Sequence, residues 1–136
     1  MHTADVIHIE GIGEVYAGKL HDAGVTTTDA LLEQGATPEG RKRLEEKTGI
    51  SHKLILKWVN RADLFRVKGV GEQYSDLLAA AGVETVLELA QRRPDHLHQM
   101  LVEANEQKHL VRVVPPPEHV AQWVEEAKKL PRKVNY

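Results

Sequence analysis

The sequence contains no cysteine among its 136 residues. A chain without cysteine forms no disulfide, no thiolate zinc site and no cysteine nucleophile, so these chemistries are excluded. Cytosolic proteins rarely use disulfides, and the absence therefore fits a cytoplasmic protein.

Long apolar runs are missing as well. No run approaches the ~18 consecutive apolar residues that a membrane span needs. The polar residues 1–5 lack the basic region and the following apolar region of a signal peptide. We therefore expect a cytoplasmic protein with no membrane partner.

The chain also lacks an excess of basic residues. It has 18 Lys and Arg against 20 Asp and Glu, which gives a net charge of −2 with neutral histidines. Dedicated nucleic-acid-binding proteins usually have a basic balance. Any phosphate binding must therefore come from local geometry and local charge. The apolar content of 41% is enough for one compact domain or two very small ones.

An internal repeat is the strongest feature of the sequence. Residues 4–31, ADVIHIEGIGEVYAGKLHDAGVTTTDAL, align without a gap with residues 62–89, ADLFRVKGVGEQYSDLLAAAGVETVLEL. Twelve of the 28 aligned positions are identical at a constant offset of 58, far more than a chance alignment gives. The later parts match more loosely, since Lys57-Trp58-Val59 recurs as Gln122-Trp123-Val124 at an offset of 65.

The repeat divides the chain into two modules, residues 1–61 and residues 62–136. The second module carries about seven extra residues in a proline-rich insertion near residues 110–118. This insertion is either a rigid bend that lets the last helix pack, which we favour, or an exposed apolar ridge for a partner. Ala62 and Asp63 belong both to the end of one copy and to the start of the next, which predicts a continuous helix across the junction.

Two glycine turns occupy equivalent places in the modules. We call Gly11-Ile12-Gly13 the first glycine turn and Gly69-Val70-Gly71 the second glycine turn. Glycine adopts backbone conformations that a β-carbon resists, so each turn breaks a helix. The apolar spacing after each turn predicts a new helix that ends before Gly24 or Gly82.

Capping residues predict the other helices. Threonine at an N-cap, glutamate three positions later and proline at the first helical position all mark a helix start. No segment alternates with period two over a useful length, and residues 111–114 are the only strand-like run. We predict an all-α fold of about nine or ten helices, with the two modules packed into one compact helical unit. The N-cap or first-turn signals are Thr27, Thr37-Pro38, Ser51, Thr85 with Glu88, Pro94 and Pro117.

The residues around both turns resemble the helix-hairpin-helix motif. The first copy reads Ile9-Glu10-Gly11-Ile12-Gly13 and continues to Ala23-Gly24-Val25, and the second runs from Val67 to Val83. Each half is similar to the small N-terminal helix-hairpin-helix domain of archaeal and eukaryotic recombinases. The whole chain from Ala4 to Tyr136 resembles a bacterial family that is known as a domain of unknown function with tandem helix-hairpin-helix motifs.

This resemblance implies a phosphate site at each turn. In helix-hairpin-helix proteins the backbone N–H groups and the dipole of the second helix hold a phosphate oxygen, and no base edge is read. Carried onto this chain, the implied contacts are Gly11, Ile12 and Gly13 in the first turn, and Gly69, Val70 and Gly71 in the second turn. Lys68 and Arg66 add positive charge beside the second turn.

Acidic residues oppose this phosphate site. Glu14 and Glu72 directly follow the turns, where a carboxylate satisfies the same N–H groups and repels a phosphate. Glu10 stands where the second copy has Lys68. At the second turn, a phosphate site and a purely structural helix–helix turn therefore stay level. At the first turn, the structural interpretation is favoured.

No catalytic pattern is present in the sequence. There is no nucleophile elbow, P-loop or dinucleotide fingerprint, and no two of the eight histidines have the i,i+4 spacing of a helical metal site. We expect a non-enzymatic macromolecule-binding module without catalytic residues, cofactor or metal. Two partners stay about level, namely DNA bound independently of its sequence and a protein in an assembly. The oligomeric state, monomer or homodimer, stays open.

Overall fold

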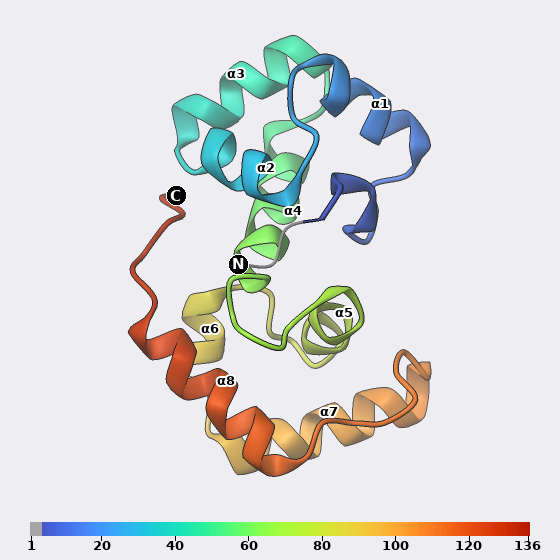
Figure 1. Cartoon of the computed structure of the whole chain (residues 1–136), viewed down its shortest axis with the longest axis vertical. Coiled ribbons are helices and arrows are strands. Elements are labelled where there is room, and N and C mark those ends of the chain that lie inside the picture. Colours follow the sequence, from blue (N-terminus) through green and yellow to red (C-terminus); the bar gives the residue numbers. More distant parts are fainter. Residues whose placement is uncertain (1–3) are drawn as a thin grey trace. The chain divides into compact units, whose positions relative to one another are not determined.

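The computed structural model describes residues 4–136, and its regular structure in that range is entirely helical (Figure 1). The all-α prediction is therefore confirmed. The predicted nine or ten helices are eight α-helices and one short 3-10 helix over the described residues. Their order is η1 (Val6–His8), α1 (Glu14–Asp22), α2 (Thr28–Gly35), α3 (Pro38–Thr48), α4 (His52–Leu64), α5 (Glu72–Ala80), α6 (Val86–Ala90), α7 (Pro94–Lys108) and α8 (Pro117–Lys129).

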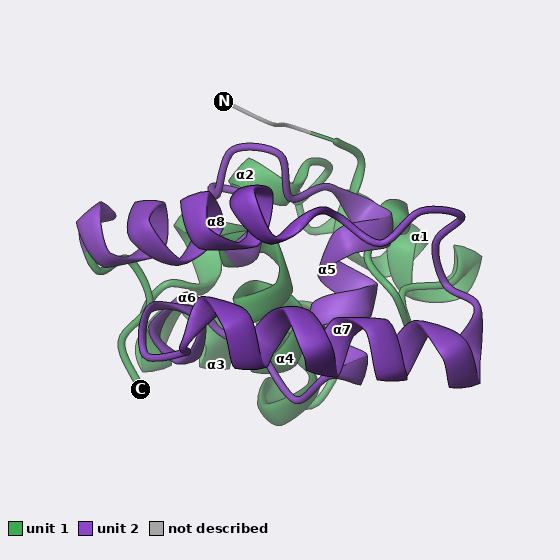
Figure 2. Cartoon of the chain, turned by 90° about the horizontal axis from the view of Figure 1, so that it is seen from below, with its two compact units in different colours: residues 1–63, 132–136 green, residues 64–131 purple. Residues whose placement is uncertain are grey.

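The chain divides into two compact units (Figure 2). Unit 1 comprises Met1–Asp63 and Arg132–Tyr136, and unit 2 comprises Leu64–Pro131. The last five residues thus belong to unit 1, although the repeat assigns them to the second module. Helix α4 runs without a break through the predicted module junction at residues 61 and 62.

The core of unit 2 is built on α8. Val120, Trp123, Val124 and Ala127 recur at helical spacing and are all buried, which makes one face of α8 apolar. This helix packs against α6 and α7, and α5 packs against α7. The aliphatic side chains of all four helices therefore share one cluster.

The proline-rich insertion is held by a side chain of α7. Asn105 donates from Nδ2 to the Val111 carbonyl at 3.0 Å and accepts from the Val111 N–H at 2.9 Å. Val111 and Pro115 are buried, whereas Val113 is 71% exposed. The strand-like run at residues 111–114 forms no strand, and Asn105 takes up both backbone groups of its first residue.

The threonine caps lie where the sequence predicts them. The hydroxyls of Thr27, Thr37 and Thr85 accept from the N–H groups three residues later at 3.0–3.1 Å. In a standard capping box the glutamate accepts from the N–H of the N-cap residue. Here the Glu88 carboxylate instead accepts from the Glu84 N–H and from the Thr85 hydroxyl. Helix α7 runs to Lys108 and ends at His109, whose backbone is left-handed with a φ of 51°.

Candidate functional site: the two glycine turns

The two glycine turns have nearly the same backbone. The φ angles of Gly11 and Gly69 are +92° and +89°, in the left-handed region that only glycine adopts readily. In each turn the central N–H donates back to the residue three positions earlier at 3.0 Å, from Ile12 to Ile9 and from Val70 to Val67. The two copies of the repeat, which are offset by 58 residues, therefore share conformation as well as sequence.

A buried tryptophan lies beneath each turn. A β-carbon at Gly11 would lie 3.5 Å from Nε1 of Trp58, and one at Gly69 would lie 3.2 Å from Nε1 of Trp123. Both indoles are at most 4% exposed. Glycine is thus required at these positions for its φ angle and also for close packing. Both tryptophans are part of the hydrophobic core and do not offer a stacking surface.

A tyrosine of the following helix packs on each tryptophan. The ring centroids of Tyr16 and Trp58 are 5.2 Å apart, and those of Tyr74 and Trp123 are 5.4 Å apart. The interplanar angles of 59° and 52° are typical of tilted aromatic pairs. This pair fixes the start of α1 and of α5 relative to the tryptophan below.

Both helices that follow the turns begin without a side-chain cap. Gly13 and Gly71 are the N-cap residues of α1 and α5, and their extended backbones accept the first helical bonds at 2.9 Å. Glycine has no side chain, so it leaves the first-turn N–H groups to other partners. Nothing in unit 1 demands glycine at position 13, because its φ of −85° suits any residue and its β-carbon would meet open space.

The predicted contact residues separate into two groups. Ile12 and Val70 are buried side chains whose N–H groups are already used inside the turn. Gly11, Gly13 and Gly69 are exposed. Within the predicted set, the glycines are therefore the positions where a ligand can approach the backbone.

The structure adds Glu126 to the second glycine turn. The Lys68 N–H donates to Oε1 of Glu126 in α8 at 3.0 Å, and Nη2 of Arg66 donates to the Pro131 carbonyl at 3.0 Å. The side chain of Lys68 is exposed. A carboxylate thus lies against the turn that the sequence marks as basic. Sequence reasoning missed it because Glu126 lies 58 residues after Lys68.

The first glycine turn has the opposite charge arrangement at the equivalent positions. The offset of 58 places Glu10 opposite Lys68, and the offset of 65 places Arg61 opposite Glu126. Glu10 is exposed and Arg61 is buried. In the first turn of α1, Val15 is 71% exposed and stands in the place of Gln73. The first turn therefore combines acidic and apolar surface.

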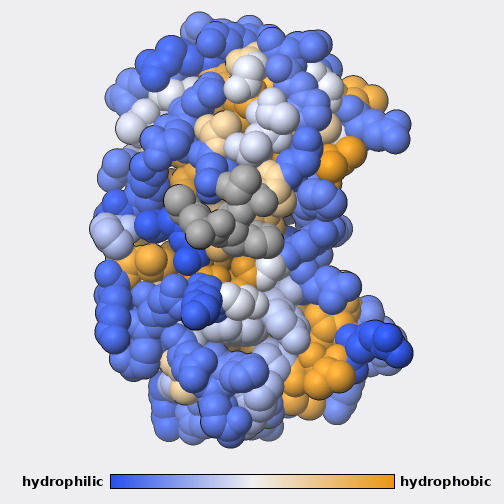
Figure 3. Space-filling view, viewed as in Figure 1, coloured by the Kyte–Doolittle hydropathy of each residue, from blue (hydrophilic) through white to orange (hydrophobic). Residues whose placement is uncertain are grey.

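Neither unit has a large net charge. Unit 1 has ten Lys and Arg and ten Asp and Glu, whereas unit 2 has eight and ten. On the face that Figure 3 shows, the surface is mostly hydrophilic with separate apolar areas. The electrostatics of a binding site thus depend on individual residues beside the turns.

Two carboxylates of unit 1 bind backbone N–H groups. Asp5 accepts from the Ile7 N–H at 3.0 Å, and Glu45 accepts from the His52 N–H at 2.8 Å. These hydrogen bonds, together with the His21 ring beside Asp5 and the His52 ring beside Glu45, lower the pKa of both carboxyl groups. Both side chains are therefore ionised acceptors near neutral pH.

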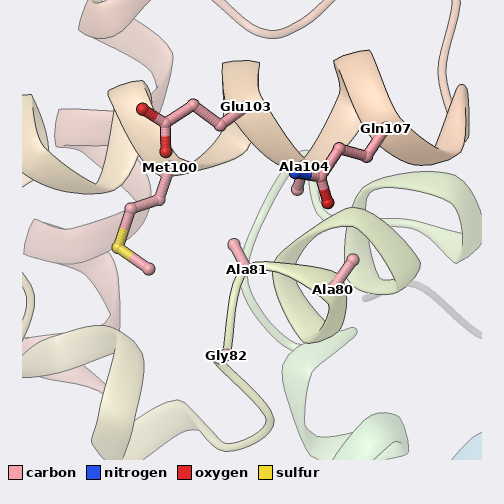
Figure 4. Close-up of a pocket in the computed structure, with 7 residues that line it drawn as sticks. All are labelled: Ala80, Ala81, Gly82, Met100, Glu103, Ala104 and Gln107. Atoms are coloured by element: carbon pink, nitrogen blue, oxygen red, sulfur yellow. The ribbon is translucent and has the colours of Figure 1, made fainter.

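Unit 2 also has an open groove of about 380 Å³ between α5 and α7 (Figure 4). Ala80, Ala81 and Gly82 form one wall, and residues 100–107 of α7 form the other, with Glu103 and Gln107 as its polar groups. Within residues 4–136, no group of three or more His, Asp or Glu side chains is placed to hold a metal ion. No described helix is long and apolar enough to span a membrane.

Comparison with known proteins identifies the family of this chain. The model of the family described as a domain of unknown function, DUF4332, matches residues 10–130. The match includes both glycine turns and all the helices from α1 to α8, so the chain belongs to this family. No curated protein and no solved structure matches the chain.

Proposed function

We propose that the chain is a non-enzymatic macromolecule-binding module of the helix-hairpin-helix type. Its second glycine turn binds the sugar-phosphate backbone of nucleic acid, independently of sequence. The observation that carries this proposal is the start of α5. Its N-cap is a glycine without a capping side chain, and the exposed Lys68 lies three positions before it.

The chemistry of this contact follows from the backbone. First-turn N–H groups and the positive end of the helix dipole favour an anion at the start of a helix. The Lys68 ammonium adds a second attraction for a phosphate. Since no base edge is involved, DNA binding is insensitive to sequence and weakens steeply with salt.

Glu126 limits the strength of this contact. Its carboxylate holds the Lys68 N–H, so a phosphate meets a competing anion at the turn. Glu72, in the first turn of α5, adds a second negative charge. We therefore expect a dissociation constant of about 10⁻⁴ M at physiological salt, at the weak end of non-specific DNA binding.

Fluorescence anisotropy with labelled duplex and single-stranded DNA tests this function. At low salt we expect saturable binding, and Lys68→Glu weakens it about tenfold through the loss of attraction and the added repulsion. The control is Lys57→Glu, which reverses an equally exposed charge on α4 of unit 1 and leaves binding nearly unchanged. Absence of binding at low salt to both kinds of DNA contradicts the proposal.

Protein binding is the second candidate function, and the first glycine turn favours it. Val15 is 71% exposed, and Glu10 and Glu14 lie on either side of the turn. Apolar surface rimmed by charge is typical of protein contacts. If the partner is a second copy, sedimentation velocity shows a homodimer that Val15→Asp dissociates. A chain that stays monomeric at all accessible concentrations contradicts this self-association.

A further inference from the structure

Residues 132–136, which we call the strap, belong to unit 1 and form neither a helix nor a strand. Figure 1 shows the end of the chain beside α2. The Asn135 N–H donates to the Ala36 carbonyl at 2.8 Å, and the Asn135 carbonyl accepts from Nη2 of Arg41 at 2.7 Å. Both backbone groups of one residue are thus held, as in the recognition of an extended peptide.

Arg41 is built into the corner between α2 and α3. It is only 4% exposed, and its Nη1 donates to the Gly35 carbonyl at 2.8 Å. Within residues 4–136 it takes part in no ion pair, and its guanidinium donates to two carbonyl groups. Burial lowers the pKa of Arg41. A buried cation requires such acceptors, and the strap supplies one of them.

Side chains add selectivity to this backbone contact. Val134 is 3% exposed and is buried in unit 1. The Lys133 ammonium pairs with Glu33 of α2, and the Tyr136 hydroxyl donates to Oδ1 of Asn60 at 3.0 Å. The corner therefore accepts a basic residue, then an apolar residue, and an aromatic hydroxyl two positions further on.

The strap joins the last helix through a short hinge. Helix α8 ends at Lys129, and Leu130 has an extended backbone with φ −68° and ψ 131°. Pro131 fixes the next φ angle. Exchange of a segment across such a hinge is a low-cost route to a dimer, because the exchanged contacts are the same in the closed and exchanged forms.

We propose that the corner formed by Ala36, Arg41, Glu33 and Asn60 is a peptide-binding site. The strap occupies it as an intramolecular ligand, and the strap of a second copy takes its place when the intramolecular contact opens. The exchange does not depend on nucleic-acid binding at the second glycine turn.

Two complementary variants test the exchange. Arg41→Met keeps an unbranched apolar stem and removes the donors of the site, while the strap stays intact. Asn135→Pro removes the N–H of the strap, while the residues of the site stay intact. Each variant alone is expected to be monomeric in sedimentation velocity. Their mixture is expected to form a heterodimer, in which the intact strap of one chain occupies the intact site of the other.

A peptide measurement gives the binding directly. A labelled peptide of residues 129–136, KLPRKVNY, is titrated into the wild-type chain and into Asn135→Pro. The peptide is expected to bind Asn135→Pro at least about tenfold more tightly, since the weakened strap competes less. The control peptide carries proline in place of Asn135 and does not bind. Folded variants that form no heterodimer and bind no peptide at millimolar concentration overturn the proposal.

If a variant does not fold, hydrogen exchange of the wild-type chain tests whether the strap opens locally. The Asn135 N–H is expected to exchange much faster than the Ile55 N–H, which donates to the Ser51 carbonyl inside α4. Faster exchange shows that the strap opens locally while the core stays folded. Equal free energies of exchange for the two amides overturn the proposal, because the strap would then open only with global unfolding.

Discussion

The first and second glycine turns have nearly the same backbone conformation but differ in the charged residues around them. In both, a glycine with φ near +90° lies over a buried indole, and a glycine N-cap starts the next helix. They differ in charge, because Glu126 binds the Lys68 N–H at the second turn, whereas Glu10 and Arg61 occupy the equivalent positions in the sequence. The repeated sequence thus gives both turns one conformation, whereas the charge at the second turn also depends on a residue of a helix distant in the sequence.

The largest expected effect comes from removing the indole below one turn. Trp123→Ala leaves a cavity beneath Gly69 and is expected to lower the free energy of unfolding by about 3–5 kcal/mol. Hydrogen exchange at the Val70 N–H is expected to accelerate more than exchange at the Ile12 N–H, and Trp58→Ala to reverse this order. Equal acceleration at both amides would show that the two turns do not respond separately.

A smaller effect is expected from adding a β-carbon to a turn. Gly69→Ala forces a left-handed alanine and a contact of 3.2 Å with Trp123, so we expect a loss of stability. The loss is about 1–3 kcal/mol in denaturant unfolding. Gly11→Ala loses somewhat less, because its contact with Trp58 is 3.5 Å.

Gly13→Ala is the matched control for these substitutions. Its β-carbon meets open space and its φ is ordinary, so its stability changes by less than about 1 kcal/mol. A loss at Gly13 as large as the loss at Gly69 would refute the assignment of Gly69 to a strained and crowded position.

The next effect is on DNA affinity at the second turn. Glu126→Gln keeps an oxygen that can accept from the Lys68 N–H and removes the negative charge. We expect DNA affinity at low salt to rise about threefold, since the half-buried charge repels phosphate partly through water. Glu125→Gln is the control, because it removes a charge from the same helix that is paired with Lys128. Equal gains from both substitutions indicate a general charge effect and contradict a specific role of Glu126.

The smallest effect concerns pH. The pKa of Glu45 is lowered in the folded chain by the bond from the His52 N–H, so ionised Glu45 stabilises unit 1 at neutral pH. This contribution is present above the ordinary glutamate pKa of about 4.3 and is lost as the pH falls through the lower folded value. Glu45→Gln is therefore expected to reduce the fall in Tm between about pH 5 and pH 3. An unchanged pH dependence contradicts this contribution.

Local signals were sufficient to predict most of the helices. Thr27, Thr37 and Thr85 cap as expected, and the aliphatic spacing of α8 gave its buried face. These features depend on residues within one helical turn, where hydrogen bonding and periodicity act directly. Ile12 and Val70 are predicted phosphate contacts, but their N–H groups already donate to carbonyl groups inside the turn.

The features that sequence reasoning missed all depend on long-range contacts. Glu126 reaches Lys68 across 58 residues, and Arg41 reaches Asn135 across 94. Neither contact leaves a periodic or capping signal in the sequence. The sequence Arg41-Lys42-Arg43 is typical of a solvated surface, so it does not indicate that Arg41 is buried.

Nuclear magnetic resonance of backbone amides tests the central claim most directly. A short DNA duplex is titrated into the ¹⁵N-labelled chain at low salt, and the amide shifts at both glycine turns are followed. We predict saturable shifts at Gly71, Glu72 and Gln73 that in Lys68→Glu need about tenfold more DNA to saturate, with smaller shifts at Gly13 and Glu14. Shifts that are absent from the second turn, or that are equally large at both turns, would contradict the proposed difference between them.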